Sequence, residues 1–116
     1  MKNTLISALL VTLMGCNTAH TASAKPLTAP EKGVLCDTYI CADKSGVSVD
    51  LTRKHLGEAA AQAILSQGEF DVTEFTFATG VFCDTKEKAC HIDRYFDANG
   101  QRSALDAKHT ALLFGE

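Results

Sequence analysis

One short motif occurs twice in this chain, each time with a second cysteine close behind it. The stretch Gly33–Cys41 reads GVLCDTYIC, and the stretch Gly80–Cys90 reads GVFCDTKEKAC. After each copy come a Gly, a Ser and then the pattern Leu-x-x-Lys-His, which ends at His55 and at His109. The shared order predicts an internal duplication of a hairpin–turn–helix unit. Because each unit is too small to bury its own apolar face, we expect the two units to share one core.

The pattern of apolar residues and turns predicts the same elements in both copies. The first copy begins with two short strands, Gly33–Cys36 and Tyr39–Ala42, around an Asp-Thr turn, and the second begins with the strand Val81–Asp84 and the polar loop TKEK. In the first copy a helix follows within residues 50–68, capped by Ser48 or Asp50 and weakened at Gly57. In the second copy we expect a strand over residues 89–96, a turn at DANG and a final helix capped by Ser103. The helical spacing predicts core positions at Leu51, His55, Leu56, Ala60, Ala63, Ile64, Leu105, His109, Leu112 and Leu113. The predicted fold class is α+β, a small antiparallel sheet with two to three helices, built from an internal duplication of a disulfide-stapled hairpin–turn–helix unit.

Of the five cysteines, one lies near the N-terminus and four belong to the two copies of the motif. Cys16 follows the N-terminal apolar run, so it is either removed with that run or carries lipid. The other four form two close pairs, and an even number of cysteines in a small exported domain is typical of a disulfide framework. Each pair flanks a predicted hairpin turn, which places antiparallel neighbours within disulfide reach. We therefore expect disulfides Cys36–Cys41 and Cys83–Cys90, while cross-pairing between the copies stays open as an alternative.

The N-terminus has the layout of a secretory signal peptide. A short basic start is followed by an uncharged apolar run over residues 5–15. That run is too short to span a bilayer and is followed by small and polar residues. The protein is therefore expected to be exported.

Two processing sites compete in this region. An Ala-x-Ala site predicts cleavage between Ala24 and Lys25. The stretch LMGC resembles the bacterial lipobox, and on that interpretation Cys16 becomes the lipidated first residue. The expected organisation is a signal peptide over residues 1–24 (or 1–15 in a lipoprotein), a linker or tether over 25–32, and one disulfide-stabilised domain over 33–116.

The charge of the chain limits its partners. After Ala24 it keeps ten Lys and Arg against fourteen Asp and Glu, a net charge of −4. This balance argues against nucleic acid and anionic membrane surfaces, and it is compatible with a basic protein partner. Contact with the membrane is expected only through a lipid anchor on Cys16.

The duplication singles out two pairs of candidate functional residues. Asp37 and Asp84 each follow a cysteine, and their expected role is to hydrogen-bond the amides of the hairpin turns. His55 and His109 are placed equivalently by the Leu-x-x-Lys-His pattern, as a pair that either binds a ligand or packs at a helix edge. Zinc binding by the four cysteines with His91 is disfavoured by loose spacing and by export. We expect no catalytic residues, no metal and no cofactor, since the motifs of hydrolases, phosphate loops and zinc proteases are absent from the sequence.

The sequence resembles a known family at three places. The stretches GVLCDTYICAD, GEFDVTEFTFATGVFCD and DRYFDANGQRS are together similar to the Fels prophage protein-like family, the YcgJ-type exported bacterial proteins. The resemblance runs from about Gly33 to Phe114. It implies a small exported bacterial protein, partly phage-associated, with no settled activity or catalytic residues.

The resulting expectation is a small envelope protein, located in the periplasm or, if Cys16 is lipidated, at the outer membrane. We expect a non-enzymatic binding or interaction module. One alternative is an inhibitor of a basic hydrolase such as lysozyme. The other is a small periplasmic enzyme or ligand carrier that uses the two aspartates and the two histidines.

Overall fold

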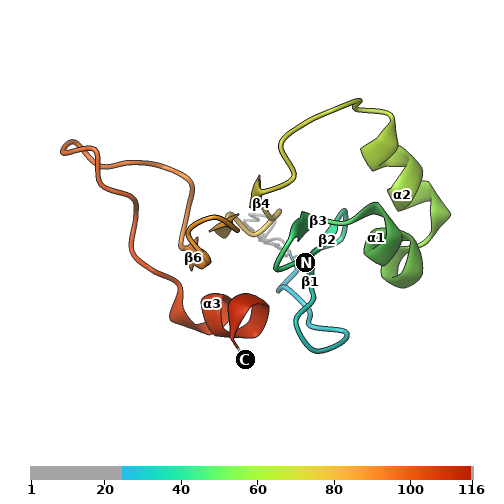
Figure 1. The fold of residues 1–116 in the computed structure, drawn as a ribbon, viewed down its shortest axis with the longest axis horizontal. Helices are drawn as coiled ribbons and strands as arrows, with labels where there is room; N and C mark the ends of the chain where they lie inside the picture. Colours follow the sequence, from blue (N-terminus) through green and yellow to red (C-terminus); the bar gives the residue numbers. More distant parts are fainter. Residues whose placement is uncertain (1–24, 116) are drawn as a thin grey trace, which may run out of the picture.

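The computed structural model describes residues 25–115 of the chain. The predicted signal peptide and Cys16 lie outside these residues. Two antiparallel sheets of three strands each, β1-β2-β3 and β4-β5-β6, occupy the middle of the molecule, and three helices flank them (Figure 1). The α+β class predicted from the sequence is therefore confirmed. The elements are β1 Leu35–Cys36, β2 Cys41–Asp43, β3 Gly46–Val47, α1 Val49–Leu56, α2 Glu58–Leu65, β4 Glu74–Thr76, β5 Phe82–Asp84, β6 Ala89–His91 and α3 Ala107–Phe114.

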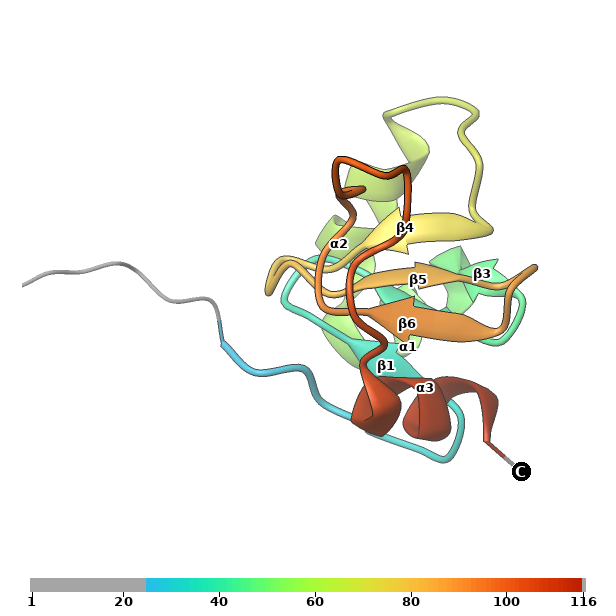
Figure 2. The ribbon, with the colours of Figure 1, turned by 90° about the vertical axis from the view of Figure 1, so that its left-hand side faces the viewer.

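The two sheets have the same pattern of pairing. In the first unit (residues 27–57) Thr28 bridges to β1, β1 pairs with β2, and β2 pairs with β3. In the second unit (residues 74–115) β4 pairs with β5, β5 pairs with β6, and His91 bridges to Leu105. Figure 2 shows β4, β5 and β6 side by side. Leu27 also packs on the core, so the packed domain includes part of the segment expected to be a tether.

A common hydrogen-bond pattern attaches a helix to each sheet. The amide of Ser48 donates to the carbonyl of Cys41, and the amide of Asp106 donates to the carbonyl of Cys90. Each of these two residues is also the N-cap of the helix that follows, because its side chain accepts a hydrogen bond from the third residue of that helix. The predicted cap at Ser103 is therefore wrong, and Asp106 holds that place. The Ser103 hydroxyl instead donates to the Asp93 carbonyl at 2.9 Å.

Glycines follow the ends of α1 and α3, whereas α2 ends at Leu65 with Ser66 as its C-cap. Gly57 has a positive φ and separates α1 from α2, so the predicted helix over residues 50–68 is two helices. Gly115 follows the second unit's helix α3 at the matching place. Helix α2 and the connection over residues 66–73 have no counterpart after α3 among the described residues.

The two units share the larger of two apolar clusters. The first unit contributes Leu35 and Ala42 to it, and the remaining members come from the second unit: Phe75, Phe77, Val81, Cys83, Cys90 and Leu113. A smaller cluster of Val34, Cys36 and Cys41 packs against Leu51 and Leu56 of α1. The predicted shared core is confirmed.

Several predicted core and strand positions are wrong. Strand β6 ends at His91, and Ile92, expected to extend that strand, is 54% exposed. In α2 the buried positions are Ala61 and Ile64, whereas Ala63 is exposed. Leu105 and Leu112 are also exposed, and Leu113 is the buried residue of α3. The strand stops early because the chain leaves the sheet at Ile92 and returns to it only at Leu105.

Two hydrogen bonds connect the first unit to the second unit and to the chain just before it. The Val47 amide donates to the Val72 carbonyl at 2.9 Å, which brings β3 close to the start of β4. The Asp37 carboxylate accepts a hydrogen bond at 2.6 Å from the amide of Ala78, in the turn between β4 and β5. In the part of the chain that the structure describes, no helix has the length and apolar character needed to cross a membrane.

Candidate functional site

The two aspartates of the repeated motif hold the hairpin turns. Asp37 Oδ1 accepts hydrogen bonds from the second and third amides after it, at 2.7 and 2.8 Å. Asp84 Oδ1 accepts from the second and third amides after it, at 2.8 and 3.2 Å. Their second oxygens have different partners. Asp37 Oδ2 accepts from the Ala78 amide, and Asp84 Oδ2 accepts from the Arg102 guanidinium. Both carboxylates are therefore engaged with the protein itself.

The two histidines are not equivalent in the structure. His55 Nε2 lies 2.6 Å from Glu31 Oε2 near the end of α1, whereas His109 Nδ1 lies 2.7 Å from Asp106 Oδ2 in the first turn of α3. The N-caps and the Thr52 and Thr110 hydroxyls, which accept from the Cys41 and Cys90 amides, set the true alignment of the helices. In that alignment Ser48 corresponds to Asp106, so Leu51 corresponds to His109. The match of the Leu-x-x-Lys-His patterns paired Leu51 with Leu105, which is one helical turn away.

The carboxyl groups of these two pairs have lowered pKa values. Hydrogen bonds from His55 and Lys54 lower the pKa of Glu31 below its usual value. Burial alone would raise the pKa of Asp106, but hydrogen bonds from the amide and ring of His109 outweigh it, and the pKa is lowered. The Glu31–His55 pair therefore joins α1 to the chain before β1, whereas the Asp106–His109 pair lies within the first turn of α3.

The cysteines form the two local disulfides, Cys36–Cys41 and Cys83–Cys90. Each joins directly opposed residues of neighbouring antiparallel strands, and all four cysteines are buried. Their sulfur atoms are thus not available as thiolate ligands for zinc. Among residues 25–115, no group of three or more His, Cys, Asp or Glu side chains is arranged to hold a metal ion.

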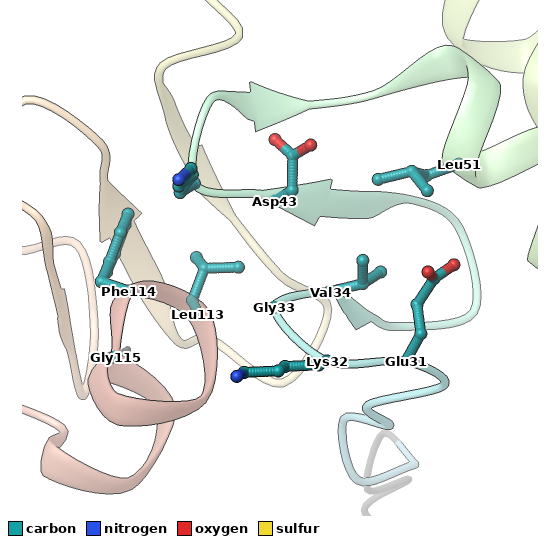
Figure 3. A pocket seen from close by; sticks show the side chains of 10 residues that line it. Glu31, Lys32, Gly33, Val34, Asp43, Leu51, Leu113, Phe114 and Gly115 are labelled. Atoms are coloured by element: carbon teal, nitrogen blue, oxygen red, sulfur yellow. The ribbon is translucent and has the colours of Figure 1, made fainter.

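A cleft of about 480 Å³ opens between the two units (Figure 3). Its apolar wall consists of Val34 and Leu51 from the first unit and Leu113 and Phe114 from α3. Glu31, Lys32, Asp43 and Lys44 also line it, so two carboxylates and two ammonium groups surround the apolar wall. Its size is within the range of sites for small molecules.

A long loop (residues 92–104) is the main difference between the two units. In the first unit β2 and β3 are joined by a tight turn at Lys44 and Ser45, but in the second unit the equivalent connection is the long loop. It extends away from the sheets at the left of Figure 1. Three large apolar side chains on it face solvent: Ile92, Tyr95 and Phe96 are 54%, 62% and 57% exposed.

The long loop is held in one shape by contacts at its tip. Asp97 Oδ1 accepts hydrogen bonds from the amides of Asn99 and Gln101, which fixes the predicted turn at DANG. A β-bridge between Phe96 and Arg102 closes this turn.

Further contacts anchor the base of the loop to the sheet. The Arg102 guanidinium stacks on Phe82 of β5 and on Phe96, with 4.7 and 4.9 Å to the ring centroids, and binds Asp84 at 3.3 Å. The buried His91 ring lies 2.8 Å from the Ser103 carbonyl and 2.9 Å from the Glu87 carboxylate. The sequence interpretation named neither Arg102 nor Phe96. The available signal was the spacing of the two copies: Cys83 follows Cys36 by 47 residues, whereas Leu105 follows Leu51 by 54, which indicates extra residues in the second copy.

A second exposed apolar area lies beside α2. It is a groove of about 470 Å³ between the end of α2, the start of α1 and the connection over residues 66–73. Leu65, Phe70 and Val72, which line it, are 51%, 42% and 37% exposed. We call this area the α2 groove.

Comparison with known proteins gives a family but no assigned activity. Residues 27–114 match the family described as YcgJ protein. The chain is 48% identical over 105 residues to the uncharacterized protein YcgJ of Escherichia coli (strain K12), covering 90% of this chain and 86% of the relative. No solved structure matches the chain. The extent of the family match and of this identity shows that the chain belongs to the YcgJ protein family.

Proposed function

We propose that this protein is an exported, non-enzymatic module that binds another protein through the long loop. The observation that carries the proposal is the comparison of the two units. In the first unit a tight turn is enough to add the last strand to the sheet and to attach the helix that follows. The second unit forms the equivalent sheet and helix attachment with the long loop, so the fold itself does not need that length. A connection that is longer than the fold requires, and that exposes three large apolar side chains, is typical of an interaction site.

The composition and the shape of the loop favour a protein partner. Tyr, Phe and Arg are enriched among the residues that contribute most to protein–protein binding. The Arg94 guanidinium stacks on the exposed Tyr95 ring, with 5.3 Å to its centroid. The hydrogen bonds of Asp97 and the stacking of Arg102 fix the loop before binding, which reduces the conformational entropy lost on association.

The overall charge favours a basic partner. The net charge of −4 after Ala24 attracts basic proteins and speeds their encounter. In the most concrete form of the proposal the partner is a basic hydrolase such as lysozyme, whose cleft accepts the projecting loop. Two disulfides suit the oxidising compartment in which such a partner is met. The proposed location is the periplasm, or the outer membrane if Cys16 is lipidated.

The binding test uses the exported protein purified after natural processing. Its affinity for a basic lysozyme is measured by calorimetry, together with the activity of the lysozyme. We expect a complex, and we expect Tyr95→Ser to weaken it at least about tenfold, as for a central aromatic contact. Tyr39→Ser is the matched control, because Tyr39 is 68% exposed and belongs to the first unit. Absence of a complex with the lysozyme rejects the hydrolase form, and equal binding by the Tyr95 and Tyr39 variants rejects the role of the loop.

The location is tested separately. Mass spectrometry of the processed protein distinguishes a lipidated N-terminal Cys16 from a free N-terminal Lys25. A protein that keeps residues 1–15 would contradict export.

A ligand carrier is the second candidate, favoured by the cleft between the two units. An apolar wall with carboxylates and ammonium groups around it suits a small amphipathic molecule. This cleft is not lined by the two candidate pairs, Asp37 with Asp84 and His55 with His109. His55 does bind Glu31, which lines the cleft. Binding of small molecules from envelope extracts, followed by the amide signals of Gly33 and Val34 in NMR spectra, tests this candidate. Unchanged signals reject it.

A further inference from the structure

The α2 groove is an exposed apolar surface that the long loop does not account for. Its walls come from four places: Val47 of β3, Val49 at the start of α1, Ile64 and Leu65 at the end of α2, and Phe70 and Val72 in the connection that follows. Ile64 is buried, whereas Leu65 and Phe70 are exposed at the opening. The groove therefore has a firm apolar base and open sides.

The segment that forms most of the α2 groove carries only acidic charges. Residues 58–76, which form α2, the connection and β4, contain four carboxylates and no Lys or Arg. Glu69 lines the groove, and the exposed side chains of Asp71 and Glu74 belong to the same segment. Hydrogen bonds from the hydroxyl and amide of Thr73 lower the pKa of Asp71, so this carboxylate is charged at neutral pH. Glu58 is paired with Arg53 at 2.6 Å and Lys86 lies near Asp71, so the acidic character beside the groove comes from Glu69, Asp71 and Glu74.

We propose that the α2 groove binds a basic amphipathic segment of a partner protein, with the apolar side chains of the segment in the groove and its Lys or Arg residues against the carboxylates. Charge complementarity selects this occupant. An apolar segment without basic residues would leave the carboxylates of the rim without partners, and an acidic segment would be repelled. An amphipathic segment in a hydrophobic groove is a common mode of peptide recognition.

This surface is separate from the one in the proposed function. In Figure 1 the long loop extends at the left, whereas α2 lies at the right. No residue of the long loop lines the α2 groove. The inference therefore stands whether or not the loop binds a protein.

The test uses the processed full protein labelled with ¹⁵N and a synthetic amphipathic helical peptide of leucine and lysine. We expect the amide signals of residues 64–72 to shift on titration, while those of residues 92–104 do not. We expect raised salt to weaken binding, since part of the attraction is between exposed charges. A peptide in which glutamate replaces each lysine is the charge control, and equal binding of that peptide overturns the proposal.

Matched variants separate the groove from the loop. Phe70→Ser is expected to weaken peptide binding at least about tenfold, and Tyr95→Ser is its control on the other surface. Glu69→Gln removes one carboxylate at the groove and is expected to weaken binding about two- to fivefold, whereas Asp97→Asn removes one from the loop without effect. Leu65→Ser serves as a second apolar variant, and the ¹⁵N spectrum of each variant shows whether it is folded. Binding by folded Phe70 and Leu65 variants with unchanged affinity overturns the proposal, and this result leaves the lysozyme test of the loop unaffected.

Discussion

At the scale of single residues, two threonines fasten the helices to the sheets. Thr52 Oγ1 accepts a hydrogen bond from the Cys41 amide and donates to the Ser48 carbonyl. Thr110 Oγ1 accepts from the Cys90 amide in the second unit. The sequence interpretation gave neither threonine a role, because a threonine in a helix does not by itself show which distant amide it will meet.

We predict that Thr52→Val destabilises the protein more than Thr110→Val does. Valine keeps the shape of the side chain but leaves the donor amide without a partner. Thr52 is fully buried, so the Cys41 amide loses its acceptor where water cannot replace it, at a cost of about 1–3 kcal/mol. Thr110 is partly exposed, and the loss there should be smaller. Urea unfolding of the two variants measures the difference, and equal losses would contradict this account.

Asp106 makes part of the free energy of unfolding depend on pH. Its pKa is lowered in the folded protein, so the stabilisation is fully present above the pKa of an unfolded Asp. It is lost as the pH falls through the lowered folded value. We predict that Asp106→Asn, which can still cap α3, removes this component of the pH dependence, whereas Asp106→Ala also removes the cap, at a cost of about 1 kcal/mol. The free energy of unfolding measured between neutral and acid pH tests this, and identical acid slopes for the wild type and the Asn variant would count against it.

At the scale of elements, the tight turn of the first unit determines how close the two sheets come. Gly46 begins β3 with a φ of +119°, and it is buried against the chain just before β4. A Cβ atom at this position would lie 2.2 Å from the Val72 carbonyl oxygen. The neighbouring Val47 amide donates to this same oxygen. The glycine is therefore required by the approach of a distant segment as well as by its own turn.

We predict that Gly46→Ala costs more than Gly33→Ala by about 1–3 kcal/mol, as for an overpacked site. Gly33 also has a positive φ, but no atom lies within 4 Å of the position of its Cβ, so its variant bears only the backbone strain. Hydrogen exchange gives a second measurement, because the Val47 amide should exchange faster in the Gly46 variant. Equal costs and unchanged exchange would show that β3 can move away from Val72 freely.

At the scale of the whole molecule, each disulfide belongs to a different apolar cluster. Cys83 and Cys90 lie in the cluster shared by the two units, whereas Cys36 and Cys41 lie in the smaller cluster under α1. Both disulfides close short loops, with sequence separations of 5 and 7. They hold each hairpin together locally, and apolar packing holds the hairpins to one another.

We predict that replacing either cysteine pair by alanine lowers the free energy of unfolding by roughly 2 kcal/mol, the loss expected for so short a loop. The two losses should add, since the pairs lie in separate clusters. Together they approach the whole stability of a small domain, so the four-alanine variant should be largely unfolded at 37 °C. Urea unfolding of the three variants measures this, and a four-alanine variant as stable as the wild type would refute the stabilising role.

The sequence by itself determined the local features of this protein. The α+β class, the paired hairpins and the break at Gly57 follow from residues close together in the chain. The same local reasoning favoured the Cys36–Cys41 and Cys83–Cys90 disulfides, and the structure decided them against cross-pairing. Turn residues, hairpin pairing and glycine conformations depend on only a few neighbouring residues. The repeated motif gives the same local evidence at two places in the chain.

The tertiary structure alone decided which distant groups meet. It placed the cap of α3 at Asp106 instead of Ser103. It also gave His55 and His109 positions in α1 and α3 that differ by one helical turn. It also folded the second unit's extra residues into a fixed loop by stacking Arg102 on Phe82 and Phe96. Sequence similarity aligned the helices by their Leu-x-x-Lys-His letters, but hydrogen bonds to the Cys41 and Cys90 backbone fix their true positions. The reason is physical: a helix is positioned by the groups it must satisfy in the sheet, and that requirement is a property of the packed molecule.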